Sequence, residues 1–455
     1  MSNAPRVIYW FRTDLRLHDS PALAAALDLK PECLYPIWTW DPHYVYRARV
    51  GVNRWQFLID CQNDLSQGIT RINKNSKLLV LREAPQTLLP KLFKEWKITH
   101  LVFEKDTDAY ARERDDKVCE IANEMGEVLN TYKGKASEPP TSLQGQLLFR
   151  DMYFGAQAAI GYPFAQTAKN DHCRFVPWHL PSKVDEKTGL ITGEYEIDDP
   201  QKEEWFKRWR NGKTGFPWID ALMRQLAQEG WIHHLGRHAV ACFLTRGGCY
   251  IHWERGAEVF EELLIDHETA CNVGNWQWLA CVAFYSQYYR CYSPIAFPQK
   301  WDKEGAFVRK YVPELKDMPT KYIYEPWKAP IQDQKKAGVM IKGDGEQEKE
   351  GNLNLYPKPI FDFAKQREVC INGLKSAYSI GLYGDSPQVL DGTWKKMFDD
   401  DAEGPTEGHK GGPAGSLGNA DAHGTEDLKP DTKATPSKKR GGQSTLEKAF
   451  KKAKT

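Results

Sequence analysis

The chain has 455 residues, enough for two or more domains that each bury a core. Hydrophobic residues make up 41% and charged residues 27%, which is typical of a globular protein in water. The formal net charge is only +1, so a nucleic-acid-binding surface would have to be a local basic patch. No apolar stretch is long enough to span a membrane, and the N-terminus lacks the pattern of a secretory signal, so neither feature is predicted.

Cysteine and tryptophan are the two informative minority residues. Ten cysteines are scattered without a C-x-x-C pair or metal-ligand spacing, so we expect reduced thiols of an intracellular protein and no metal site. Sixteen tryptophans are many for this length, and several lie in segments that carry other chemical signals.

Residues 6–132 alternate between short apolar runs and stretches with helical periodicity. The runs predicted as buried strands are Val7–Phe11, Cys33–Trp38, Leu78–Leu81 and Leu101–Phe103. The predicted helices are Pro21–Leu27, Asn53–Ser66, Leu88–Trp96 and Ala109–Met125. Such alternation predicts an α/β domain with a doubly wound parallel sheet over residues 1–132.

Beyond the predicted sheet, aromatic, histidine and arginine residues become dense and helical periodicity dominates. A mainly α-helical domain is therefore predicted over residues 139–398. Two polar segments inside it, Ser182–Gln201 and Gln332–Asn354, are predicted as a surface insertion and a charged loop. Residues 399–455 have too few apolar side chains to offset the entropy of ordering, so we expect a disordered basic tail.

Four motifs identify a family resemblance. They are YWFRTDLRLHD at 9–19, GKTGFPWIDA at 212–221, GWIHHLGRHAV at 230–240 and NVGNWQW at 272–278. In this order they closely resemble the photolyase/cryptochrome family, most of all the (6-4) DNA photolyases and animal-like cryptochromes. The resemblance covers residues 6 to about 383 and implies an α/β antenna domain followed by a helical FAD-binding domain.

His234 and His238 are four residues apart, so a helix would place them on one face. A structural role in the core is the simpler interpretation of such a pair. The resemblance implies instead that both contact a DNA lesion and supply a proton, a role that suits the side chain that titrates near neutral pH.

A group of charged and amide residues follows. Asp266 and Glu268 lie between apolar stretches, where a carboxylate needs a partner, and Arg237 is the expected partner of Asp266. That pair could be purely structural. The resemblance implies that it frames the flavin ring, that Asn272 faces the flavin N5, and that Glu268 stands where the family has a shorter aspartate.

The resemblance also identifies an electron relay. It implies that Trp276 lies beside the flavin, Trp253 in the middle and Trp178 near the surface, with Tyr250 at a fourth position. Core aromatics without a redox role are the alternative interpretation.

Residues 144–151 (QGQLLFRD) resemble the helix that lines the lesion pocket. The resemblance implies that Gln146 contacts a flipped base, that Phe149 replaces a tryptophan in the pocket wall, and that Arg150 lies near the flavin.

Two further binding surfaces are expected. The resemblance implies an antenna chromophore of the deazaflavin or folate type in the α/β domain, with Asp41, Arg49 and Asn53–Phe57 as candidate contacts. Basic residues that alternate with aromatics predict a DNA-binding rim, although a solvated face is the alternative; they are Lys300, Lys303, Arg309, Lys310, Lys321 and Lys328.

The resemblance has one gap. After residues 130–132 the family continues with an interdomain linker, the first flavin-domain helices and a Ser/Thr-rich turn that holds the flavin diphosphate, whereas this chain passes directly to residues 142–146. We therefore expect weak FAD binding and exposed apolar surface on the helices next to the gap. An alternative transcript or a mispredicted gene model would explain it.

The tail carries two short motifs. The basic cluster Lys438, Lys439 and Arg440 is typical of nuclear import, so we expect the nucleus, with the cytoplasm as a second location. Gln443, Leu446 and Phe450 resemble a motif that binds the sliding clamp, although an alanine replaces its first aromatic and a helix without a partner is the alternative.

The leading hypothesis is a monomeric photolyase that uses excited, reduced FAD to repair (6-4) pyrimidine–pyrimidone photoproducts in UV-damaged DNA. The alternatives are a cryptochrome-type blue-light receptor that signals without repair, and an isoform that cannot hold FAD.

Overall fold

The computed structural model describes residues 4–124, 128–130 and 143–399. These residues belong to one compact unit, Met1–Lys410, in which an α/β region precedes a helical region. The predicted nuclear-import cluster (Lys438, Lys439, Arg440) and clamp motif (Gln443, Leu446, Phe450) lie outside the described residues.

The α/β region is built on a five-stranded parallel sheet in the order β3-β2-β1-β4-β5. Its strands are β1 (Arg6–Phe11), β2 (Cys33–Thr39), β3 (Leu79–Leu81), β4 (His100–Val102) and β5 (Val128–Asn130). Its helices are α1 (Pro21–Asp28), α2 (Pro42–Arg47), α3 (Val52–Ile72), α4 (Pro85–Trp96) and α5 (Ala109–Glu124). The predicted doubly wound parallel sheet is confirmed.

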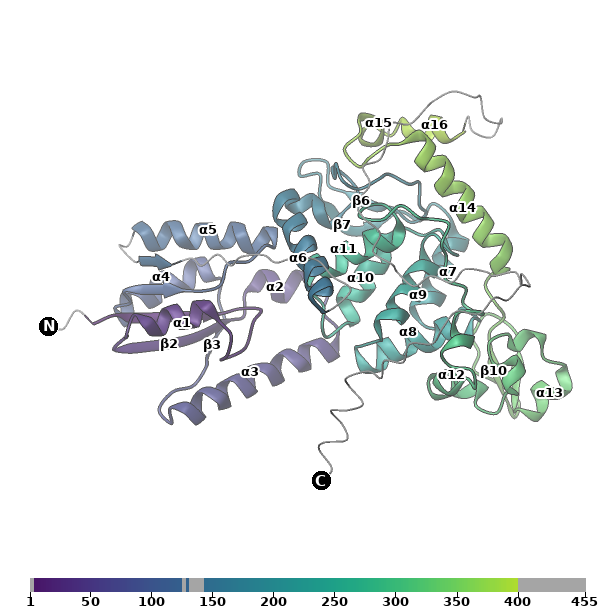
Figure 1. The fold of residues 1–455 in the computed structure, drawn as a ribbon, viewed down its shortest axis with the longest axis horizontal. Coiled ribbons are helices and arrows are strands. Elements are labelled where there is room, and N and C mark those ends of the chain that lie inside the picture. The colour runs from purple at the N-terminus through teal and green to yellow at the C-terminus, as the bar shows by residue number, and fades with distance from the viewer. Residues whose placement is uncertain (1–3, 125–127, 131–142, 400–455) are drawn as a thin grey trace, which may run out of the picture. The chain divides into compact units, whose positions relative to one another are not determined.

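Alternation along the central strand β1 explains why both faces of the sheet are covered. Ile8 and Trp10 pack into one core with α4 and α5, whereas Val7, Tyr9 and Phe11 pack into a second core with α1 and α3. Figure 1 shows these two helix pairs on opposite faces of the sheet. A strand buried on both faces is a continuous apolar run, which is why β1 was predictable.

The helical region holds most of the core. Its helices are α6 (Leu143–Ile160), α7 (Pro200–Arg210), α8 (Pro217–Glu229), α9 (His234–Leu244), α10 (Trp253–Leu263), α11 (Thr269–Ala280), α12 (Ala306–Tyr311), α13 (Ile331–Lys336), α14 (Phe363–Ile380), α15 (Pro387–Leu390) and α16 (Trp394–Asp399). Local signals set several ends: proline occupies the first turn of α8, and Gly230 ends it in the left-handed conformation at φ +68°.

Two polar segments of this region form small sheets. The predicted surface insertion contains an exposed antiparallel hairpin, β6 (Ser182–Val184) and β7 (Ile191–Tyr195). The loop prediction for Gln332–Asn354 was wrong, because β8 (Val339–Ile341) and β9 (Lys349–Glu350) pair with β10 (Leu353–Tyr356). The cause is burial: the Tyr356 hydroxyl donates to the buried carboxylate of Asp220 on α8, which draws the segment against the core.

A seam of hydrogen bonds and ion pairs joins the start of α3 to α10 and its C-terminal end. The Gly51 amide donates to the Glu262 carbonyl at 2.7 Å, and the Arg54 guanidinium donates to the Glu261 carbonyl at 2.8 Å. Arg49 pairs with the largely buried carboxylate of Glu258 at 2.8 Å. A Cβ atom at Gly51 would lie 2.6 Å from the Glu262 oxygen, so this approach requires glycine.

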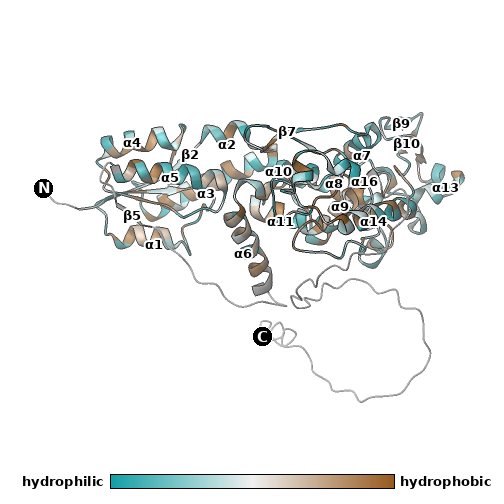
Figure 2. Cartoon of the chain, turned by 90° about the horizontal axis from the view of Figure 1, so that it is seen from above, coloured by the Kyte–Doolittle hydropathy of each residue, from teal (hydrophilic) through white to brown (hydrophobic). Residues whose placement is uncertain are grey.

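Helix α6 has an unusually apolar exposed surface. Leu147, Phe149 and Met152 are all exposed, and Figure 2 shows hydrophobic residues along much of the helix. Its other face packs on α11, where the Tyr153 ring covers Gly274. Exposed apolar surface was expected on the helices beside the gap in the resemblance, and α6 follows that gap directly.

Among the described residues, no helix combines the length and hydropathy needed to cross a membrane. The same residues contain no group of three or more His, Cys, Asp or Glu side chains that could hold a metal ion.

One close helix contact yields a stability prediction. A Cβ at Gly256 of α10 would lie 2.0 Å from the Trp276 ring, whereas a Cβ at exposed Gly155 of α6 would meet nothing within 4 Å. We expect Gly256→Ala to lower the free energy of unfolding by about 1–3 kcal/mol. Gly155→Ala, the matched control, should raise it by about 0.5–1 kcal/mol. Denaturant titration measures both, and equal effects would contradict the packing account.

Candidate functional site

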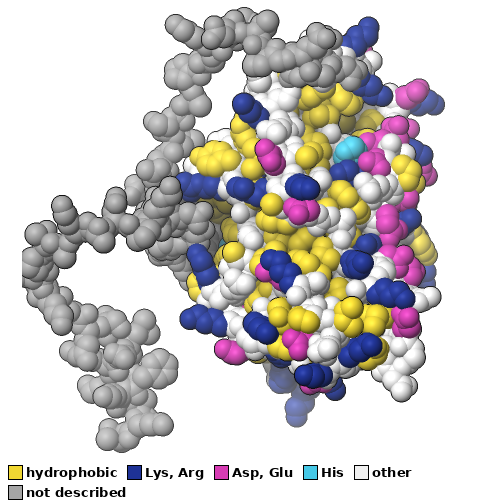
Figure 3. Space-filling model, turned by 90° about the vertical axis from the view of Figure 1, so that its right-hand side faces the viewer, with side chains coloured by type: hydrophobic (Ala, Val, Ile, Leu, Met, Phe, Trp, Pro, Cys, Tyr) yellow, Lys and Arg dark blue, Asp and Glu magenta, His cyan; other side chains and the backbone are white. Residues whose placement is uncertain are grey.

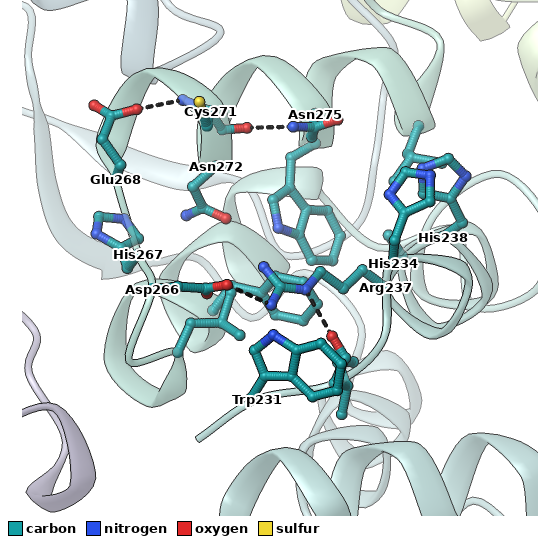
Figure 4. Close-up of a pocket in the computed structure, with 16 residues that line it drawn as sticks. Trp231, His234, Arg237, His238, Asp266, His267, Glu268, Cys271, Asn272 and Asn275 are labelled. Atoms are coloured by element: carbon teal, nitrogen blue, oxygen red, sulfur yellow. Dashed lines mark hydrogen bonds and ion pairs between the residues drawn. The ribbon is translucent and has the colours of Figure 1, made fainter. Parts of the chain in front are cut away.

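A pocket of about 310 Å³ lies among α9, α10, α11 and the segment that joins α10 to α11. Figure 4 shows the histidines of α9 on one side and the polar residues of α11 on the other. The pocket brings together seven residues that the sequence singled out, which are His234, Arg237, His238, Asp266, Glu268, Asn272 and Trp276. The sequence predicted that these residues share one site.

Arg237 and Asp266 form the ion pair expected from the sequence. Their side chains are 2.8 Å apart, and the Arg237 Nε also donates to the Ile232 carbonyl at 3.0 Å. The Asp266 side chain is half exposed, so water screens the pair and its contribution to stability is small. Its consequence is geometric, because it fixes the guanidinium across the pocket.

The two histidines share a face of α9, as their spacing predicts. Their ring centroids are 4.1 Å apart, and His238 Nδ1 lies 3.2 Å from the Tyr292 hydroxyl. Burial, followed by the charges of His234 and Arg246, lowers the pKa of His238 to about 3. Burial also lowers the pKa of His234. Both imidazoles are therefore neutral near pH 7 in the chain alone.

On α11, Glu268 and Asn272 already have partners within the chain. The Glu268 carboxylate is the N-cap of the helix and accepts from the amides of Ala270 at 2.9 Å and Cys271 at 2.8 Å. The Asn272 amide group donates to the Ala257 carbonyl of α10 at 2.9 Å. The Asn272 carbonyl oxygen therefore stays available to a ligand as an acceptor.

Among the described residues, Trp276 has ring contacts with Trp209 and Phe260 and Trp253 has one with His252, so no ring contact joins the two tryptophans expected at the start of the relay. Trp276 lines the pocket and packs over Gly256 of α10. Trp253 is the first residue of α10 and is fully buried. It lies three residues before Gly256, so its side chain and the Trp276 ring are on the same side of α10. The Trp253 indole N–H donates to the Thr167 hydroxyl at 3.1 Å.

The outer end of the relay differs from the prediction. Trp178 was expected near the surface, but only 4% of it is exposed, because it packs in the core of the helical region with its ring centroid 4.6 Å from that of Tyr250. Tyr250 is buried as well. Within the described residues, the Trp178 indole N–H and the Tyr250 hydroxyl have no hydrogen-bond partner.

The predicted lesion-pocket helix, α6, does not contribute to this pocket. Phe149 is exposed and its ring lies 6.4 Å from that of Tyr153, and the Gln146 side chain lies outside the described residues. Arg150 pairs with Asp151 at 3.0 Å, and both line a second hollow of about 520 Å³. This hollow lies at the carboxyl ends of β1 and β4, where parallel sheets place ligands.

The residues suggested for an antenna site are occupied by internal contacts. Asp41 is buried, caps α2 and accepts from the Tyr110 hydroxyl at 2.8 Å. Arg49 belongs to the seam with α10. Neither lines the second hollow.

The pocket and its immediate surroundings also include residues that the sequence did not single out. Tyr292 contacts His238 from 54 residues away, a separation that no helical or strand period encodes. His267 lines the pocket with its Nδ1 buried and without a partner among the described residues, and burial lowers its pKa to about 3. Trp231 lies at the pocket edge and is partly exposed. It belongs to the same motif as both histidines, and that motif was the signal that could have identified it.

Comparison with known proteins gives two family matches. Residues 7–147 match the family described as DNA photolyase, and residues 142–376 match the FAD binding domain of DNA photolyase.

Curated relatives include both branches of this family. The chain is 31% identical to Cryptochrome-2 of Gallus gallus, covering 82% of this chain and 83% of that protein. It is 31% identical to the (6-4)DNA photolyase of Oryza sativa subsp. japonica, covering 84% and 92%. These matches extend over 523 and 543 positions, more than the 455 residues of this chain, so the relatives carry residues without a counterpart here.

Solved structures share the fold. A class III photolyase from Agrobacterium tumefaciens has a TM-score of 0.66 at 20% identity, covering 83% of this chain and 99% of that one. A cryptochrome from Synechocystis has a TM-score of 0.66 at 19% identity, covering 82% and 100%. The prediction of an α/β region followed by a helical FAD-binding region is confirmed.

The pocket fits the ring of FAD better than its diphosphate. Apolar walls from Trp276, Phe260 and Leu279 and neutral polar groups at Asn272 and His267 suit a planar heteroaromatic ring. Among its described lining residues, however, the only cationic side chain is Arg237, which Asp266 neutralises, and none is serine or threonine. A diphosphate needs cations or free amides, and Glu268 already occupies the α11 amides.

We therefore expect the chain to bind FAD weakly and with little preference for the dinucleotide. Riboflavin, FMN and FAD should have dissociation constants within about threefold of one another, a difference below about 1 kcal/mol. Quenching of flavin fluorescence measures all three. Purification with nearly one FAD per chain, or FAD binding tenfold tighter than riboflavin, would contradict the expectation.

Proposed function

Because the chain belongs to the photolyase/cryptochrome family, we propose that it is descended from, and retains the reaction centre of, a light-driven enzyme that repairs (6-4) photoproducts in DNA. The observation that carries the proposal is the pair His234 and His238 on one face of α9, beside the pocket that suits a flavin ring. A flavin pocket alone is compatible with both repair and signalling. Two imidazoles at its edge favour repair, because they can exchange protons with a bound lesion.

Bound there in reduced form, the flavin would supply an electron to the damaged base on excitation by light. Protein groups would then manage the proton. Burial raises the pKa of Tyr292, so its hydroxyl keeps its proton, and this hydroxyl lies 3.2 Å from His238 Nδ1. In the tautomer that carries its hydrogen on Nε2, His238 would accept from this hydroxyl and present an N–H donor to a basic oxygen or nitrogen of the lesion.

Asn272 and the Arg237–Asp266 pair would position the ring. The Asn272 carbonyl oxygen accepts from an N–H group, which matches a reduced flavin protonated at N5. The guanidinium, held by Asp266 and the Ile232 carbonyl, would form a fixed polar wall of the site that holds the ring. Neither group has to reorganise when a ligand enters.

A blue-light receptor without repair activity is the second candidate. It is supported by the similarity to Cryptochrome-2 of Gallus gallus and by buried Trp276 and Trp253, which a receptor would use equally well. Repair of a lesion-containing duplex under blue light separates the two candidates.

We further propose the second hollow as an antenna site. It lies at the carboxyl ends of β1 and β4 and is lined by Arg12, Lys105 and Arg150 together with four acidic residues. Support comes from a solved photolyase of Sulfolobus tokodaii, described as holding two FAD molecules with a novel light-harvesting cofactor implied, with a TM-score of 0.63 at 20% identity. Charges of both signs suit a polar chromophore.

The proton role predicts a selective loss of repair. In the chain supplied with the linker segment of a relative and loaded with FAD, His238→Ala should abolish (6-4) repair and leave lesion binding largely intact. His172→Ala is the control, because that exposed histidine lies outside the pocket. Light-dependent repair and lesion affinity are measured in parallel, and repair at the original rate would remove the proton role of His238.

The relay role predicts a separate phenotype for Trp253→Phe. Phenylalanine keeps an aromatic ring in the core but is smaller and loses the indole N–H bond to Thr167, so some stability should be lost while the fold is kept. Because phenylalanine is much harder to oxidise, electron hopping should stop there. In the same restored chain, FAD binding should be normal and blue-light reduction of oxidised FAD with external thiol should fail. Repair by chemically reduced FAD should persist. Photoreduction at the original rate would show that Trp253 is only a core aromatic.

A further inference from the structure

The turn after the 3₁₀ segment Pro298–Lys300 holds an indole in solvent. Trp301 is 68% exposed, more than any other tryptophan of the chain. Within the described residues its ring takes part in no aromatic stack, cation–π contact or hydrogen bond. A large ring with no use inside its own chain is typical of a contact surface.

The turn itself is rigid. The Asp302 carboxylate accepts from the Tyr324 hydroxyl at 2.9 Å and from the Phe307 amide at 3.1 Å. Gly305 closes the turn at φ +68°, where a Cβ would lie 2.5 Å from Ile323. Because these contacts fix the backbone, Trp301 is held outward in the free protein and a partner need not order the turn on binding.

Two exposed lysines flank the indole, and an exposed carboxylate, Glu304, follows them. Lys300 and Lys303 are exposed and have no carboxylate within 4.0 Å among the described residues, whereas Asp302 between them is turned toward Tyr324. Figure 3 views the side of the molecule that carries α12 and α13, and it shows Lys and Arg side chains interspersed with hydrophobic and acidic ones. An exposed indole between two unpaired lysines suits a nucleic acid, in which negatively charged phosphates alternate with flat bases.

The same segment connects the turn to the pocket. The Tyr292 hydroxyl lies 3.2 Å from His238, and the Tyr292 ring is 5.1 Å from that of Phe297. The Phe297 carbonyl in turn accepts from the Lys300 amide at 3.3 Å. One continuous segment therefore carries, at one end, a tyrosine that contacts the pocket residue His238 and, at the other end, the exposed indole.

We propose that Lys300, Trp301 and Lys303 form a DNA contact, in which the indole stacks on a base or sugar next to the lesion and the two lysines neutralise backbone phosphates. Stacking on a ring tolerates any base, so the contact adds affinity without sequence preference. The choice of DNA as partner rests on the proposed function. An acidic peptide would use the lysines but has no regular array of rings for Trp301, and a membrane surface would need a larger apolar patch.

The test uses the full chain in the dark and needs no flavin. Fluorescence anisotropy with a labelled duplex that carries a (6-4) photoproduct, and with the matched undamaged duplex, gives the affinity at several salt concentrations. Trp301→Ala should weaken binding to the lesion duplex about tenfold, within the range for one base stack. Trp301→Phe should retain most of the affinity. Tyr46→Ala, which removes an exposed aromatic of α2, should change nothing.

The lysines are tested by the salt dependence. Lys300→Gln and Lys303→Gln should each lower the slope of log K against log salt by about 0.9, the value for one phosphate contact. Lys74→Gln, at an exposed lysine after α3, is the matched control and should leave the slope unchanged. Circular dichroism confirms that every variant is folded.

Three outcomes would overturn the contact. Wild-type affinity in Trp301→Ala would remove the stacking role while the proposed function stands, because the chain would still bind the lesion. Displacement of DNA by polyglutamate that depends on Trp301 would show a surface for acidic polymers. Absence of any DNA binding by the wild-type chain would overturn the contact and the proposed function together.

Discussion

The placement of the Trp276 ring over Gly256 is the constraint on which the helical region depends. The ring fits because position 256 has no side chain, and it also meets Trp209 and Phe260 at centroid distances of 6.3 and 5.1 Å. This one contact sets α11 against α10 and therefore fixes the depth of the pocket between them. Asn272 and Glu268 occupy their positions because α11 carries them there.

The structure shows what periodicity encodes and what it does not. Strand β1 and helices α1 and α4 were predictable because apolar runs and helical spacing are local properties, and the predicted strand ends lie close to the observed ones. Strand β5 and helix α2 were not predicted, because β5 has only two apolar residues and the six residues of α2 are too few to show a helical period. The small sheet of β8, β9 and β10 is held by a tyrosine that reaches a carboxylate 136 residues away.

In the candidate site, too, local features were predictable from the sequence and contacts between distant segments were not. The histidine pair followed from a four-residue spacing, and the pairing of Arg237 with Asp266 from the need of a carboxylate for a partner. Tyr292 and the burial of Trp178 depend on how distant segments pack, which one sequence does not specify. Arg150 was expected near the flavin from the resemblance, but it does not line the pocket of the histidines and lies instead at the second hollow, where α6 meets the α/β region.

The protonation of the pocket histidines makes stability depend on pH and ligand binding depend on the charge of the ligand. His238 in the folded chain has a pKa well below that of an unfolded histidine, so the unfolded chain binds more protons between about pH 6.5 and 3. Its contribution to stability is therefore full above this window and is lost as the pH falls through it. An anionic ligand in the pocket would raise the same pKa, so protonation of His238 and ligand binding favour each other.

The seam between α3 and α10 has a consequence for how the molecule holds together. Gly51, Arg49 and Arg54 attach the α/β region to the helix that carries Trp253, through contacts that do not involve residues 131–142. The covalent connection between the two regions is therefore not their only attachment. Changes in the length of that connection can be accommodated while the seam keeps the two regions in register, which is how a chain could lose a long internal segment and still assemble both parts of its fold.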